Sequence, residues 1–132
     1  MKYTATKITI AFVVVLNILS CASLRKFNEE EIDKFNLVKI IKNESSLDAK
    51  CKFVKPVTVS SGDGLGFTYV VGNYENAMLL LQEKALKENA DTALIDSFQA
   101  PQLTNTMVNG TSTSTYATVT YDINARLYAC NN

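Results

Sequence analysis

The sequence predicts an α+β domain in which one helix packs on a small, mostly antiparallel sheet whose elements follow in the order ββαββ. Two patterns indicate this fold. Residues 117–129 alternate between apolar and polar side chains, as in a half-buried strand, and residues 74–89 gather apolar side chains on one face of a helix. Two short β-rich stretches precede the helix and a third follows it.

The C-terminal stretch is the clearest element. Every second residue from Ala117 to Ala129 is apolar, and most residues between them are polar or charged. A period of two describes a strand with one buried face and one face in water. Cys130 falls in the register of the wet face, so a disulfide there would lie at the rim of the sheet or require the strand to bend.

The predicted helix begins after Asn73, whose side-chain oxygen can cap the backbone N–H groups of the first turn. Its apolar face carries Met78, Leu81, Ala85 and Leu86, and charged residues lie opposite. The other three strands are expected at 36–42, 50–59 and 92–98. Because proline cannot donate to a ladder, Pro56 places the second strand at an edge or at a bulge.

Two stretches between these elements predict loops. Residues 60–72 hold four of the five glycines, so we expect turns there. The glycines at 62–66 lack both the Gly-Lys-Ser/Thr ending of a phosphate loop and the full dinucleotide-binding fingerprint, which favours a plain turn. Residues 104–114 are almost entirely Thr, Ser, Asn and Gly, and we expect a mobile loop.

The N-terminal residues predict an export signal that ends at Cys21. Two lysines and no acid precede an apolar run over residues 8–19, and Ser20 stands before the cysteine. The run is shorter than the roughly 20 apolar residues that span a bilayer. Ile18-Leu19-Ser20-Cys21 resembles the bacterial lipobox, in which this cysteine is acylated. The alternatives are an ordinary signal cut elsewhere and a lone buried thiol.

Lipidation at Cys21 would divide the chain into a signal peptide (1–20), a lipidated cysteine with a tether (21–35) and one α+β domain (36–132). The membrane is then the expected partner, through the lipid on Cys21. The resemblance to lipoproteins favours the outer over the inner membrane, because Ala22 rather than Asp follows the cysteine. As a flexible coil, the charged tether would reach roughly 20 Å.

Two further cysteines, Cys51 and Cys130, remain in the domain. An exported chain meets an oxidising compartment, where disulfides form and persist, and these two make one candidate pair. The alternative is two free thiols, buried or redox-active. No Cys-x-x-Cys motif and no histidine is present to activate one.

Composition excludes several function classes. The chain has no histidine, which removes histidine triads and histidine metal ligands. Loss of Lys2 and Lys7 with the signal would leave 11 basic against 13 acidic residues, so we expect no nucleic-acid partner.

We therefore expect a non-catalytic domain without cofactor or metal. The acids outside obvious pairs are interpreted as solvated surface groups rather than as a carboxylate dyad: Asp63, Asp91, Asp96 and Asp122. Binding of a small ligand or metal, through the loop at 62–66 or the loop at 104–114, is the alternative.

Three short motifs together resemble a group of small bacterial lipoprotein domains. They are Cys51-Lys52-Phe53-Val54, the helix end from Glu83 to Leu94, and the terminal Ala125-Arg126-Leu127-Tyr128-Ala129-Cys130. The group includes a family of unknown function and, more distantly, the Rcs-pathway outer-membrane stress sensor. The resemblance covers about residues 36–130 and implies the α+β fold, an envelope location and a Cys51–Cys130 bridge.

The chain also departs from that group. Glu88-Asn89-Ala90-Asp91 stands where the group has Gly-Ala-Asn, and Leu127-Tyr128 where it has Ala-Tyr. The stress sensor carries two disulfides, whereas this chain can form one, so the signalling role is not carried over. The expectation is a binding or sensing domain with an envelope protein as possible partner.

Overall fold

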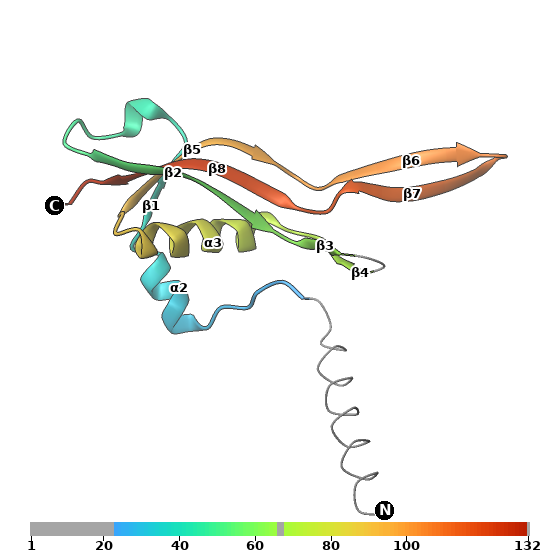
Figure 1. The fold of residues 1–132 in the computed structure, drawn as a ribbon, viewed down its shortest axis with the longest axis horizontal. Helices are drawn as coiled ribbons and strands as arrows, with labels where there is room; N and C mark the ends of the chain where they lie inside the picture. Colours follow the sequence, from blue (N-terminus) through green and yellow to red (C-terminus); the bar gives the residue numbers. More distant parts are fainter. Residues whose placement is uncertain (1–22, 66–67, 132) are drawn as a thin grey trace, which may run out of the picture.

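The computed structural model describes residues 23–65 and 68–131 and has the α+β fold that the sequence predicts (Figure 1). Its elements in chain order are α2 (Glu29–Phe35), β1 (Lys39–Ile41), a 3₁₀ turn (Glu44–Ser46), β2 (Lys52–Ser61), β3 (Asp63–Leu65), β4 (Thr68–Val70), α3 (Tyr74–Lys87), β5 (Thr92–Gln99), β6 (Gln102–Val108), β7 (Thr111–Thr118) and β8 (Tyr121–Ala129).

The four strands expected from the sequence form one sheet in the order β1-β5-β8-β2. β5 and β2 both pair antiparallel with β8, and the short β1 pairs parallel with β5. Pro56 lies in β2, at one edge of this sheet, just after a register shift between Phe53 and Lys55. The predicted edge position of Pro56 is therefore confirmed, whereas the irregularity in the strand lies just before it.

The main core lies between α3 and the inner face of the sheet. On β8, Ile123, Ala125 and Leu127 alternate inward and are buried, as the period of two predicts. They belong to one cluster with Leu81 and the small side chain of Ala85 on α3, both without exposed surface. The predicted cap is confirmed, because the side-chain oxygen of Asn73 accepts the backbone N–H of Asn76 at 2.8 Å.

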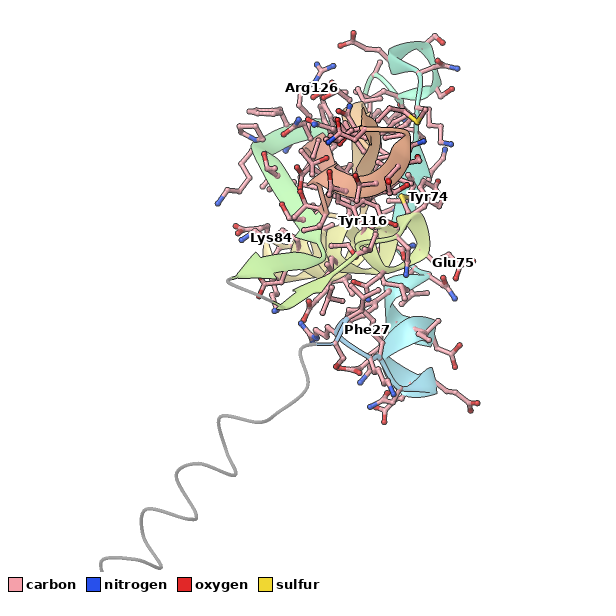
Figure 2. The ribbon with its side chains drawn as sticks, turned by 90° about the vertical axis from the view of Figure 1, so that its right-hand side faces the viewer. Phe27, Tyr74, Glu75, Lys84, Tyr116 and Arg126 are labelled. Carbon is pink, nitrogen blue, oxygen red and sulfur yellow. A yellow bond between two sulfur atoms is a disulfide. The ribbon has the colours of Figure 1, made fainter. Side chains whose placement is uncertain are left out.

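The outer face of the sheet is wet at one end and covered at the other. Residues 42–51 fold over the covered end, where Ile41, Leu94 and Tyr128 form a second buried cluster. Leu47 and the two cysteines pack against it. Cys130 follows the register of the outer face, as predicted. Residues 42–51, which cover this end of the face, bring Cys51 next to Cys130. Arg126 lies on this outer side of the sheet, and Figure 2 shows it on the opposite side of the domain from Phe27.

Residues 25–35 are not the flexible coil that the sequence suggests. Asn28 caps α2 in a capping box with Glu31, and Phe35 is buried. Arg25 binds Glu83 of α3 with an N–O distance of 2.6 Å, and its carbonyl accepts the amide of Asn76 at 2.7 Å. This stretch therefore packs on the domain, because the contacts of Arg25 with α3 and the buried ring of Phe35 hold it there.

Residues 104–114 are not a loop either. β6 and β7 form a long two-stranded hairpin that projects from the end of the main sheet (Figure 1). Asn109 and Gly110 make its turn with φ angles of 51° and 80°, the left-handed pair that a two-residue hairpin turn requires. Alternating threonines favour strands because they are β-branched, and this preference outweighs the polarity that suggested a loop.

The glycine-rich stretch at 60–72 is also more ordered than predicted. Ser60 and Ser61 complete β2, and β3 pairs antiparallel with β4 in a second hairpin. Gly62, with a φ of 99°, makes the turn between β2 and β3. Gly72 lies so close to the Ser61 carbonyl that a Cβ atom would clash with it.

Candidate functional site

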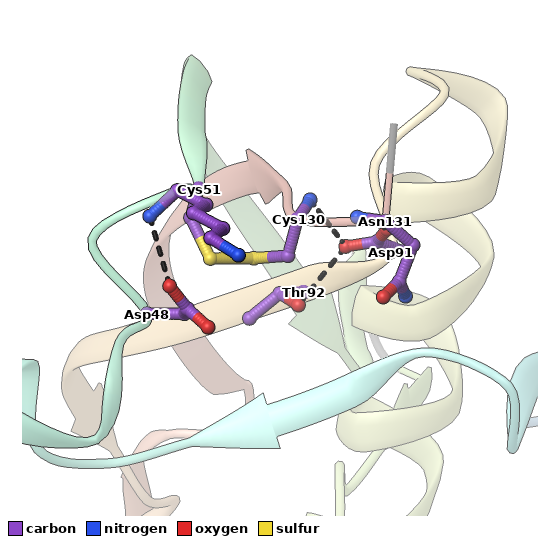
Figure 3. Close-up of a disulfide and its surroundings, with 7 residues drawn as sticks. Asp48, Cys51, Asp91, Thr92, Cys130 and Asn131 are labelled. Carbon is purple, nitrogen blue, oxygen red and sulfur yellow. Dashed lines mark hydrogen bonds between the residues drawn. A yellow bond between two sulfur atoms is a disulfide. The ribbon is translucent and has the colours of Figure 1, made fainter.

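A disulfide between Cys51 and Cys130 joins the start of β2 to the end of β8 (Figure 3). The S–S distance is 2.03 Å, and the two cysteines are 79 positions apart in the sequence. The structure therefore contains the predicted pair rather than two free thiols. A backbone hydrogen bond of 2.9 Å from Cys51 to the carbonyl of Asp48 shapes the turn that leads into the bridge.

Asp91 holds the other side of the bridge in place. Its carboxylate accepts the backbone N–H of Cys130 at 2.9 Å and that of Asn131 at 2.8 Å (Figure 3). The Thr92 hydroxyl donates to the same carboxylate at 3.0 Å. The backbone of Asp91 also bonds to β1 and β8, through the N–H of Lys39 and the carbonyl of Tyr128.

The charge on Asp91 is stabilised by these donors. Partial burial acts to raise the pKa of Asp91, but the backbone N–H groups of Cys130 and Asn131 outweigh it and hold the pKa below its ordinary value of 3.8. Sequence patterns assigned Asp91 to the solvated surface acids, and this interpretation is wrong. The structure makes it the residue that fastens the C-terminal strand.

The other acids lie apart from the bridge. Asp96 pairs with Arg126 at 2.9 Å, and Glu44 binds the same guanidinium at 3.1 Å; the two carboxylates raise the pKa of Arg126. Asp122 accepts from the Thr120 hydroxyl at 3.2 Å. Asp63 lies in β3 and is exposed.

An aromatic pocket at the N-terminal end of α3 was not predicted. β5 and β8 run past the start of the helix, so their inner-face residues lose its cover there. Phe98 of β5 stacks on Tyr121 of β8 with ring centroids 6.1 Å apart, and Tyr74 meets Tyr121 edge-on at 5.8 Å. A cavity of about 420 Å³ opens beside these rings, with Ile95 and Ile123 in its lining.

The pocket combines apolar surface with two charged residues, Lys42 and Asp96. The carboxylate of Asp96 is paired with Arg126, whereas Lys42 has no carboxylate partner among the ion pairs of the described residues. Phe98 is 64% exposed, which is unusual for a phenylalanine that faces inward in register. The Lys42 ammonium lies 5.7 Å from the Tyr74 ring centroid and also lines the cavity. Such a cavity has the size of a small-molecule site, and its rings suit a flat apolar ligand whose negative charge lies toward Lys42 and away from Asp96.

The sites proposed from sequence have different outcomes. Cys51 and Cys130 are joined, whereas Cys21 lies outside the described residues. The stretch at 104–114 is a hairpin, and residues 66 and 67 of the glycine-rich stretch are not described. Within residues 23–65 and 68–131, no three Cys, Asp or Glu side chains are grouped to hold a metal ion. No helix in the same ranges is long and apolar enough to cross a membrane.

Comparison of the chain with protein-family models, with curated proteins and with solved structures finds no match.

Removing the disulfide should destabilise the domain strongly. We expect Cys51→Ser combined with Cys130→Ser to lower the free energy of unfolding by roughly 4 kcal/mol, because the bridge restricts the unfolded chain across a long loop. Urea unfolding of the chain that begins at residue 21 measures this change. Cys21→Ser is the matched control and should leave the midpoint unchanged; equal midpoints for all three proteins would contradict the prediction.

Asp91 should make the free energy of unfolding decrease as the solution becomes acidic. Because its folded-state pKa is lowered, its contribution is complete above the ordinary value of 3.8 and is lost as the pH falls through the lower folded value. We expect Asp91→Asn to cost about 1–2 kcal/mol at pH 7, since bonds to a charged acceptor are lost. Thermal unfolding from pH 7 to pH 2 should show the difference shrinking below pH 4. A difference that stays constant with pH would exclude this role.

Proposed function

We propose that this chain is a bacterial envelope lipoprotein, anchored through lipid on Cys21, whose disulfide-bonded domain has a binding or sensing role without catalysis. The Cys51–Cys130 bridge is the observation that carries this proposal. Structural disulfides belong to oxidising compartments, which a bacterial chain reaches by export. The bridge thus supports the export signal at residues 1–20, and it leaves Cys21 as the one cysteine outside the pair.

The packing of residues 25–35 gives the anchor a short reach. Arg25 already contacts α3, through its ion pair with Glu83 and its carbonyl bond to Asn76. Four residue steps separate it from Cys21, a span of about 14 Å at full extension. An anchor on Cys21 would therefore hold the domain close to the membrane surface. The outer membrane remains the favoured one, because Ala22 follows the cysteine.

A second candidate function is small-ligand binding in the aromatic pocket. The observation in its favour is the cavity of about 420 Å³ between Lys42, Tyr74 and Phe98. On this proposal a ligand would bind at the start of α3 rather than in either of the two stretches that the sequence suggested. It is compatible with a sensing lipoprotein, since the pocket lies on the domain and not on the anchor.

Labelling tests the anchor directly. Cells that express the full chain are fed a clickable fatty-acid analogue, and we expect label on the wild-type protein and none on Cys21→Ser. Cys51→Ser is the matched control and should keep the label, because that thiol belongs to the bridge. Label that persists in Cys21→Ser, or an unlabelled wild-type protein, would overturn the lipid anchor.

Binding of a planar anion tests the pocket. We expect naphthalene-sulfonate to bind the chain that begins at residue 22, and Phe98→Ala to weaken binding about three- to tenfold, as expected for loss of one stacked ring. Leu103→Ala, an exposed apolar residue of the projecting hairpin, is the control and should bind like wild type. An NMR titration locates the contact. Chemical-shift changes confined to residues away from Tyr74 and Phe98 would contradict ligand binding in this pocket.

A further inference from the structure

The hairpin of β6 and β7, here called the arm, has two open edges. Its strands pair only with each other in the described structure, and neither joins the main sheet. All of β6 and nearly all of β7 are exposed on both faces. Figure 1 shows the arm extending well beyond the sheet and α3. An isolated two-stranded hairpin is marginally stable in water, so an arm of this length gains most from a further strand.

The two faces of the arm differ in chemistry. One face carries a threonine array, in which the Thr104 hydroxyl bonds to the Thr115 carbonyl at 2.9 Å and Thr113 bonds to the Thr106 carbonyl at 3.3 Å. The other face carries Leu103 and Met107, which are 55% and 73% exposed. Exposed apolar side chains of this size, next to strand edges with unpaired backbone groups, are typical of surfaces that another protein chain covers.

The main sheet has protected edges, and the arm does not. At one edge, β1 has three residues, begins with Lys39 and is followed by Lys42. At the other edge, β2 contains Lys52, Lys55 and Pro56. Short length, lysine and proline are the usual means by which natural sheets prevent edge pairing. Residues 97–121, which include the whole arm, contain no charged side chain.

The charge pattern points to a second copy as the occupant. A partner recognised by complementary charge would need charges on the arm, and residues 97–121 offer none. An uncharged strand of alternating threonines fits an antiparallel copy of itself, because cross-strand threonine pairs are favourable. A two-fold axis between the copies would limit the assembly to a dimer. Leu103 and Met107 of the two copies would then share one apolar face.

We propose that the arm is a self-association element, through which two copies of this chain pair edge to edge and form one continuous four-stranded sheet from their two arms. The protected edges of the main sheet confine the pairing to the arm. This inference goes beyond the proposed function and does not require lipid on Cys21, so the labelling experiment and the test below can fail separately.

The first measurement places a photocrosslinking amino acid at Ser112 of the arm, in the full chain expressed in bacteria. We expect a covalent product of twice the chain mass. The same crosslinker at Ser60, an exposed residue on the lysine-protected β2, is the control and should give none. A product with a different protein at Ser112, or no product, would overturn the proposal.

The second measurement is the mass of the detergent-solubilised full chain by light scattering. We expect two copies for the wild type and one for Thr113→Lys combined with Thr115→Lys, because these charges lie on β7, the strand that carries the crosslinker at Ser112, and repel across the pair of arms. Ser45→Lys with Ser46→Lys adds the same charge in the exposed 3₁₀ turn and should stay dimeric. Circular dichroism checks that each variant keeps its fold. A dimer that survives the arm substitutions would contradict the role of the arm.

Discussion

The antiparallel pairing of β5 with β8 joins every other part of the domain. On the inner face of this pair, Ala93, Ile123 and Leu127 form the floor on which α3 packs. On the outer face, Leu94 and Tyr128 form the small cluster under residues 42–51. One end of the pair carries the disulfide and Asp91, and the other end leads into the arm. The positions of the two hydrophobic clusters, the bridge and the arm therefore all depend on the backbone hydrogen bonds between β5 and β8.

The sequence predicted the parts whose local pattern agrees with their environment. Alternation from Ala117 onward located β8 and its buried face, and Asn73 located the start of α3. It missed two elements although their signals are present in local sequence. Asn28 and Glu31 have the spacing of a capping box, and Asn109-Gly110 is a strong hairpin signal. In both stretches, polar composition suggests a coil or a loop, whereas the position-specific signals indicate the helix and the hairpin that form.

Other features could not be found by pattern. The aromatic pocket depends on where α3 starts relative to the ends of β5 and β8, which is a matter of tertiary placement. Phe98 is in register with inward residues, and only the position of the helix leaves it uncovered. The role of Asp91 likewise depends on a contact 39 residues along the chain, with the backbone of Cys130. No local spacing reports such a contact.

The position of β8 has a consequence for the timing of folding. β8 is the last strand in the sequence, yet it lies between β5 and β2 and contributes Ile123, Ala125 and Leu127 to the core. Until these residues have left the ribosome, β2 has no neighbour in the main sheet and α3 lacks much of its packing surface. The pairings that β8 makes with β2 span most of the domain, and such distant contacts form slowly. The main sheet therefore cannot be completed until β8 has been synthesised.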